Sequence, residues 1–200
     1  MQLLEKPYLA DTTKLKPPSV RARIAAATRS LHEELHEHPV LGRLMSTDLG
    51  EEEYTNILLC HLAFYETAER LRKQLQISTE LSLAPELTWL NDDLQGDKDV
   101  CPYEGLSLEN RSQAIGMLYV LFGSRFGARV IHKNIKIALP TRRHKFFGNA
   151  LVHDRWSFLL SIIETVSTQK QEYYDVIYGA ETTFSAFGAA MLPADAVVNT

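Results

Sequence analysis

The spacing of hydrophobic residues predicts a chain built of helices. Apolar residues recur in several long segments at steps of three and four, which places them on one face of an α-helix. The first segment starts at Ser19, a residue suited to an N-cap, and runs to Pro39. The second runs from Gly50 to Leu75 and has glutamates in its first turn, where they suit the helix dipole. Since no segment alternates with period two between hairpin turns and no internal repeat is visible, we expect an all-α fold.

The second half of the chain continues the same pattern after an irregular stretch. Prolines and glycines interrupt residues 80–106, so short helices and loops are expected there. A long helix is predicted from Ser107 to Ile137, ending before Pro140. Two more helices are expected over residues 151–168 and 171–191.

The termini divide the chain into three parts. Residues 1–18, which end in two prolines, are expected to form an N-terminal extension. Residues 19–192 form one multi-helix domain in this prediction, and residues 193–200 form a frayed tail.

The most unusual segment is Leu118–Ile131, with the sequence LYVLFGSRFGARVI. On a helix its small residues would form one stripe with almost no side chain. The stripe consists of Gly123, Ser124, Gly127 and Ala128. Each glycine within a helix costs about 1 kcal/mol relative to alanine, so the segment predicts a close approach of another group or a bend. Without further evidence, tight packing against another helix is the favoured explanation.

Composition and charge narrow the possible partners. The chain has 200 residues, of which 45% are hydrophobic and 23% are charged, which suits one domain with a substantial core. A formal net charge of -4 disfavours general binding to nucleic acid or to an anionic membrane. The apolar run 114–123 is too short to span a bilayer, and the N-terminus lacks the apolar core of a secretory signal. We therefore expect a cytoplasmic protein.

The two cysteines, Cys60 and Cys101, lie far apart and lack a CxxC partner. Neither a zinc site nor a redox motif can be identified from them, so reduced thiols are expected.

His32 is a candidate metal ligand on the first helix, because it borders the apolar stripe through Leu31 and Leu35. A hydrogen-bonded structural histidine is the commoner outcome at such a position. Glu33 and His36 form one Glu-x-x-His pair, but a carboxylate-bridged di-iron site needs a second pair, and no other histidine has a glutamate three residues before it. Arg125 and Arg129 lie one turn apart on the predicted long helix, where they can meet an anion or simply be solvated.

Taken together, His32 within LHEELHEHP and the glycine-bearing segment about ninety residues later resemble the heme oxygenase family. The resemblance is strongest to its short bacterial members associated with bacteriophytochromes, and it covers most of the chain. LHEELHEHP is similar to the family's proximal segment, and LYVLFGSRFGARVI is similar to the distal-helix signature LYVLEGS-x-LGGRVI. The fold that this resemblance implies is a heme oxygenase-like helical bundle with a glycine-bent distal helix.

The resemblance also implies an activity. It is the cleavage of heme b, which serves as substrate and cofactor, to biliverdin, CO and ferrous iron, with O2 and a reductant. His32 would be the axial iron ligand, and Arg29 would pair with a heme propionate. Gly123, Ser124 and Gly127 would be catalytic, and Gly123, Gly127 and Ala128 would contact the heme. Implied partners are an electron donor such as a ferredoxin or reductase, and a bacteriophytochrome that receives biliverdin.

Departures from the family pattern keep other functions in view. Phe122 stands where the bacterial signature has glutamate, and Ala128 replaces the second glycine. The late-helix positions where mammalian-type enzymes carry basic residues for the propionates fall here near Ser157 and Ser161. One alternative is therefore a protein that binds heme or bilin without turnover. Another is a di-iron oxidase or a thiaminase-like hydrolase on the same scaffold.

Overall fold

The computed structural model describes residues 19–96, 99–149, 153–168 and 170–191, and within these ranges it is helical and contains no strand. The α-helices are α1 (Val20–Ala27), α2 (Arg29–His36), α3 (Pro39–Arg43), α4 (Glu51–Gln74), α5 (Ala84–Asp93), α6 (Arg111–Ser124), α7 (Ala128–Ala138), α8 (Lys145–Gly148), α9 (His153–Glu164) and α10 (Gln171–Ala190). A short 3₁₀-helix, η1, covers Thr79–Leu81. The all-α prediction is confirmed. The predicted extension, the frayed tail and the expected helix start at 151 lie outside the described residues.

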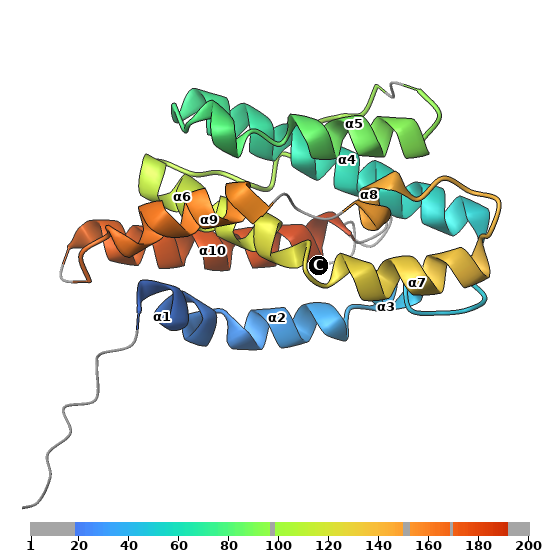
Figure 1. Cartoon of the computed structure of the whole chain (residues 1–200), viewed down its shortest axis with the longest axis horizontal. Helices are drawn as coiled ribbons and strands as arrows, with labels where there is room; N and C mark the ends of the chain where they lie inside the picture. Colours follow the sequence, from blue (N-terminus) through green and yellow to red (C-terminus); the bar gives the residue numbers. More distant parts are fainter. Residues whose placement is uncertain (1–18, 97–98, 150–152, 169, 192–200) are drawn as a thin grey trace, which may run out of the picture.

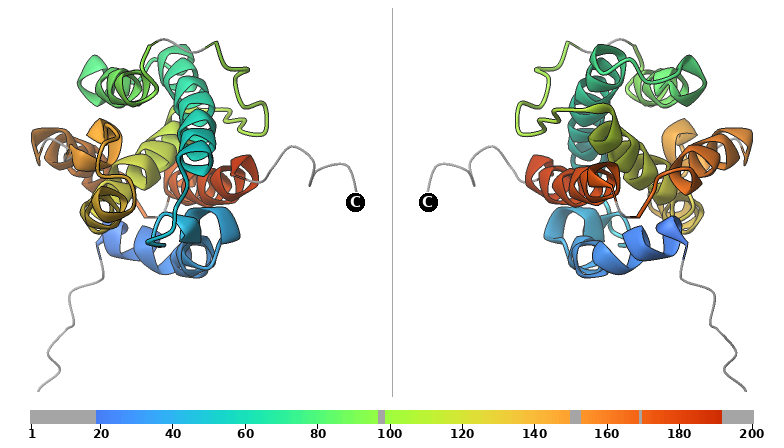
Figure 2. Two further views of the ribbon diagram at one scale, coloured as in Figure 1. Left: turned by 90° about the vertical axis from the view of Figure 1, so that its right-hand side faces the viewer. Right: turned by 90° about the vertical axis from the view of Figure 1, so that its left-hand side faces the viewer.

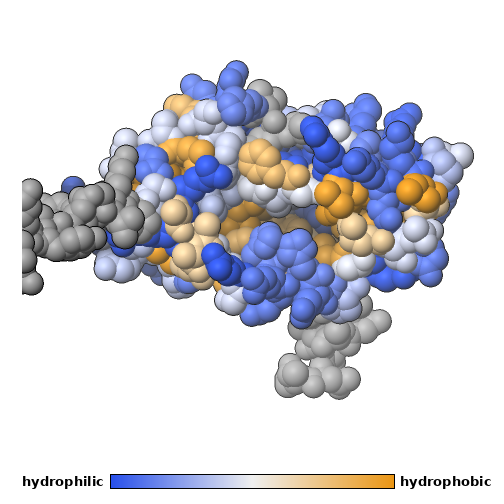
Figure 3. Space-filling view, turned by 60° about the horizontal axis from the view of Figure 1, so that its bottom comes forward, coloured by the Kyte–Doolittle hydropathy of each residue, from blue (hydrophilic) through white to orange (hydrophobic). Residues whose placement is uncertain are grey.

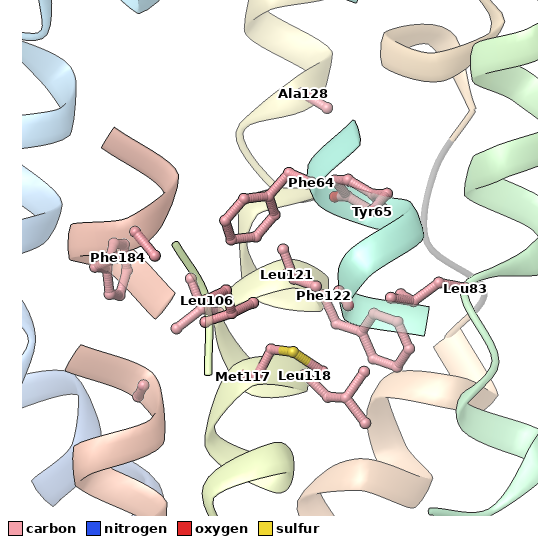
Figure 4. Packing of buried hydrophobic residues seen from close by; sticks show 14 of the residues in the cluster. Phe64, Tyr65, Leu83, Leu106, Met117, Leu118, Leu121, Phe122, Ala128 and Phe184 are labelled. Atoms are coloured by element: carbon pink, nitrogen blue, oxygen red, sulfur yellow. The ribbon is translucent and has the colours of Figure 1, made fainter. Parts of the chain in front are cut away.

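The helices are layered around α6. Figure 1 shows α1 and α2 along one side of the molecule and α4 and α5 along the opposite side, with α6, α9 and α10 between them. The end-on views in Figure 2 place α6 near the centre, where it packs against α10, α9 and α4. The apolar core gathers around this helix, and Figure 4 shows Phe64 and Tyr65 of α4 reaching it from one side.

Two glycines allow α6 and α10 to pack closely. A Cβ added at Gly116 would lie 2.0 Å from the carbonyl oxygen of Val176, and one added at Gly179 would lie 2.0 Å from that of Gln113. Atoms cannot approach so closely, so the two helix backbones touch where a side chain would otherwise separate them. This is a site of close helix packing, and it lies outside the small-residue stripe.

The first predicted helix is present but interrupted. Ser19 caps it as expected, since its Oγ accepts a hydrogen bond from the Ala22 backbone at 3.2 Å. The helix then breaks at Thr28, whose buried hydroxyl donates to the carbonyl of Ile24 at 2.9 Å. The α4 helix, by contrast, runs without a break through its predicted span.

The long helix predicted over residues 107–137 is wrong in two respects. It starts later, because Asn110 and not Ser107 supplies the N-cap, accepting from the Gln113 backbone at 3.0 Å. It is also divided into α6 and α7, which meet at 47°. Between them, consecutive backbone N–H groups bond three residues back instead of four, which tightens the turn over residues 125–127.

Among the described residues, no single helix has the length and hydropathy of a membrane span. The α6 and α7 helices together meet that criterion, but only as a bent pair.

Candidate functional site

His32 lies on the exposed side of α2, within reach of α10. Its ring is 4.6 Å from that of His36 and 6.0 Å from that of Phe184, measured between centroids. Partial burial lowers the pKa of His32, the nearby His36 lowers it further, and Glu33 acts in the opposite direction. The imidazole is therefore neutral at pH 7, the form in which its nitrogen lone pair can bind a metal ion.

In the described part of the chain, the potential metal ligands beside His32 are too few to build a metal site from protein side chains alone. Across the described ranges, no group of three or more histidine, cysteine, aspartate or glutamate side chains is placed to hold a metal ion. Glu33 and His36 are both exposed beside it. A single histidine suits an iron whose remaining ligands come largely from a porphyrin, whereas a di-iron centre would need carboxylates from several helices. The surroundings of His32 therefore fit heme better than a protein-built metal site.

The small-residue segment lies at the junction of α6 and α7, and its members point in different directions. Ser124 and Gly127 are exposed and Gly123 is half-buried, whereas Ala128 is 4% exposed and belongs to the core. The hydroxyl of Ser124 donates to the carbonyl of Leu121 at 2.8 Å. The expected stripe is therefore shared between the open face and the core.

Among the described residues, no helix backbone packs closely on the glycines of this junction. A Cβ at Gly123 would be 4.0 Å from its nearest neighbour, the ring of Trp156, and one at Gly127 would meet only the carbonyl of Ser124 at 3.6 Å. The favoured explanation from the sequence, tight helix packing, is wrong here.

Backbone conformation does not require these glycines either. Gly127 has φ −74° and ψ −23°, which any residue adopts, and the one described glycine with positive φ is Gly96. What the two glycines provide is empty space on one side of the junction.

A hollow lies on one face of the molecule (Figure 3). Figure 3 looks toward the face that carries α1 and α2 and shows a hydrophilic ridge beside a depression with apolar atoms at its floor. The α2 helix packs on α10, α1 and α3, but makes no extended contact with α6 or α7. Figure 2 shows the same arrangement end-on, with α7 set to one side of α2. A flat, largely apolar ligand suits a cleft of this kind.

The two arginines of the segment have different roles. Arg125 is buried and donates hydrogen bonds to the carbonyls of Phe146 and Asn149, so it holds α8 to the helix junction. Arg125 is therefore neither solvated nor free to share an anion with Arg129. Arg29, at the start of α2 and one turn from His32, is exposed to solvent.

Phe122 lies in the core, away from the open side of the junction. It is fully buried, and the guanidinium of Arg155 lies 4.5 Å from its ring centroid. Arg155 in turn pairs with the buried Glu86 at 2.8 Å. Figure 4 shows the Phe122 side chain extending toward Leu83. The departure from the family signature at this position therefore falls in the packing of α6 and not at its open face.

Sequence reasoning gave no role to His61, which the structure buries beneath the helix junction. Its Nδ1–H donates to the carbonyl of Ile57 at 2.8 Å, and its ring lies 5.2 Å from those of Phe146 and Phe187. Burial lowers the pKa of His61 to about 4, although the hydrogen bond to the Ile57 carbonyl acts to raise it. No local pattern marks this residue, because its environment is assembled from three helices.

Comparisons with known proteins agree on the architecture. No family model matches the chain, and no curated protein matches it. Among solved structures, the NO- and CO-bound heme oxygenase from Neisseria meningitidis superposes with a TM-score of 0.65 at 20% identity, covering 88% of this chain and 94% of that one. Heme oxygenase from Leptospira interrogans superposes with a TM-score of 0.63 at 15% identity, covering 87% and 98%. The chain therefore has the all-helical fold of these two heme oxygenases.

Proposed function

We propose that this protein is a heme oxygenase that cleaves heme b to biliverdin, CO and ferrous iron, using O2 and an external reductant. The observation that carries the proposal is the unobstructed face at Gly123 and Gly127. Neither helix packing nor backbone conformation accounts for these glycines, whereas a flat ring system needs a wall without side chains. The fold shared with two heme oxygenases supports the same conclusion.

His32 is the proposed axial ligand of the heme iron. Its lowered pKa keeps the imidazole neutral, and a neutral histidine suits oxygen chemistry on heme better than a thiolate, which favours O–O cleavage. Arg29 lies one turn away with its charge in solvent, where a heme propionate can reach it. Bound heme would supply the site of O2 activation, and the protein would supply orientation and access.

On the opposite side, Gly123, Ser124 and Gly127 are proposed to form the distal wall. The absent side chains leave room for a diatomic ligand, and the apolar floor of the hollow excludes water. Ala128 is placed differently in the proposal. Since its methyl group packs in the core, it supports the wall from behind and does not contact heme directly.

The electron donor is proposed to dock on α7. Residues 110–153 contain no aspartate or glutamate, although the whole chain carries a net charge of -4. Arg129, Lys133 and Lys136 are exposed along α7, and in the described part of the chain none of them takes part in an ion pair. A redox partner with an acidic surface, such as a ferredoxin or a reductase, would be attracted to this face. Delivery of biliverdin to a bacteriophytochrome is supported by the sequence resemblance alone.

A two-step assay tests the function. Hemin added to the purified protein should give a Soret band with one heme per chain, and reductant with O2 should then replace it by a biliverdin spectrum. His32→Ala should lose the normal axial ligation, while His36→Ala, one turn away and also exposed, serves as the matched control. Heme that binds stably but is never opened would refute the enzymatic activity and leave the non-catalytic alternative. An unchanged spectrum in His32→Ala would place the ligand elsewhere.

A further inference from the structure

The fold brings together two thiols that are remote in sequence. Cys60 on α4 and Cys101, in the segment before α6, line one open cavity of about 400 Å³. Tyr103, Glu104 and Ala190 also line it. Both thiols are free, so each is available for chemistry.

Tertiary contacts hold the segment of Cys101 against α4. The backbone N–H of Tyr103 donates to the carbonyl of Ala63 at 3.5 Å, and the hydroxyl of Thr67 donates to the carbonyl of Tyr103 at 3.0 Å. The rings of Tyr103 and Phe64 lie 5.7 Å apart. Cys60 is one helical turn before Ala63, Cys101 is two residues before Tyr103, and both cysteines line the same cavity.

The two thiols differ in exposure. Cys101 is exposed, whereas Cys60 is half-buried and its burial raises the pKa of its thiol. A small oxidant in solution therefore meets Cys101 first. Metal binding is disfavoured, because no third ligand among the described residues completes a site with these thiols.

We propose that Cys60 and Cys101 form an oxidisable pair that closes to an intramolecular disulfide. Hydrogen peroxide oxidises the Cys101 thiolate to a sulfenic acid, and the displaced oxygen leaves as water after taking up protons. The Cys60 sulfur then attacks the sulfur of Cys101, a disulfide bond forms, and a second water leaves. In sum the two thiols lose two protons and two electrons, and the peroxide is reduced to two waters.

The bond would join the middle of α4 to the segment that leads into α6. Leu106, five residues after Cys101, is buried in the core, so the cross-link would restrain the entry to the central helix. The disulfide would lie between α4 and the segment before α6, and it involves none of the residues proposed to bind heme. The inference therefore does not depend on the proposed function.

The test uses the full-length, heme-free chain. Reduced protein is treated with hydrogen peroxide, alkylated with iodoacetamide after denaturation, and analysed by intact mass and peptide mapping. We expect both thiols to become resistant to alkylation, a mass loss of about 2 Da for the two hydrogens, and one cross-linked peptide joining positions 60 and 101. Retention of two alkylatable thiols would overturn the proposal, as would a disulfide found only between molecules.

Single serine variants separate the two roles. Cys60→Ser should accumulate a sulfenic acid at Cys101 that dimedone traps, because the resolving thiol is missing. Cys101→Ser should leave Cys60 alkylatable after the same treatment. Circular dichroism confirms that each variant is folded before oxidation. Dimedone labelling of Cys101 in wild-type protein without any cross-link would show that the thiols do not meet, and would refute the pair.

Discussion

Substitutions at the two glycines of α6 test where another helix packs closely against this helix and where none does. Gly116 and Gly123 are seven residues apart, which places them on nearly the same face of the helix. Changing each to alanine adds the same methyl group to the same helix. If another helix contacted α6 along this whole face, both variants would change the free energy of unfolding in the same way. The structure predicts a loss of stability at position 116 and none at position 123.

At position 116 the added methyl group would collide with backbone. Its Cβ would lie 2.0 Å from the Val176 carbonyl oxygen and 2.7 Å from the Ala180 nitrogen. Overpacking of this kind costs about 1–3 kcal/mol, and rigid backbone neighbours place the cost at the upper end. The higher helix propensity of alanine offsets about 1 kcal/mol of this cost. We expect Gly116→Ala to lose about 2 kcal/mol in the free energy of unfolding.

At position 123 the methyl group would have no close neighbour, because the nearest atom is 4.0 Å away in the Trp156 ring. Helix propensity then dominates and the free energy of unfolding should stay constant or rise, by up to about 1 kcal/mol. Urea denaturation followed by far-UV circular dichroism measures both variants against the wild type. A loss of more than about 1 kcal/mol in Gly123→Ala would refute the open face, since it would mean that another element packs there. Equal losses of unfolding free energy in both variants would refute the predicted difference between positions 116 and 123.

Three further predictions concern charge and burial. Lys133→Glu with Lys136→Glu should slow reduction by an acidic protein donor, most strongly at low salt, while dithionite-driven turnover stays unchanged. The pKa of His61 is about 4 in the folded chain and about 6.5 in the unfolded chain, so the unfolded state binds a proton first as the pH falls. The free energy of unfolding should therefore fall by roughly 3 kcal/mol between pH 6.5 and pH 4. His61→Gln should flatten that pH dependence. Arg155→Ala should cost about 3–5 kcal/mol, because it leaves the fully buried Glu86 without its partner.

Each of these has a matched control in the chain. Lys170→Glu, at the start of α10, reverses a surface charge away from α7 and should leave donor-driven reduction unchanged. His153→Gln, at an exposed position, is the matched histidine substitution for His61→Gln. Lys145→Ala breaks an exposed pair with Asp92 and should cost at most about 1 kcal/mol. If Lys145→Ala and Arg155→Ala lowered the free energy of unfolding equally, burial of the ion pair would not explain the loss.

The site was only partly predictable from local pattern. His32 and the glycines were predicted as site residues from motifs whose members are adjacent in sequence. The direction of each small side chain was not predictable, since Gly123 and Gly127 face open space while Ala128 faces the core. That difference arises at the junction where Arg125 reaches the carbonyls of α8, a contact between segments about twenty residues apart.

The sequence by itself determined the all-α class, the uninterrupted α4 and the cap at Ser19, because helical periodicity and capping depend on residues only three or four apart. Only the tertiary structure decided that Gly116 touches another helix and Gly123 does not, since the two glycines have the same helical setting and differ only in where α10 runs. It likewise brought Cys60 and Cys101 to one cavity, which no local pattern contains. Local interactions specify which segments are helices, while the positions of those helices in space decide which faces are closed, which remain open and which distant residues meet.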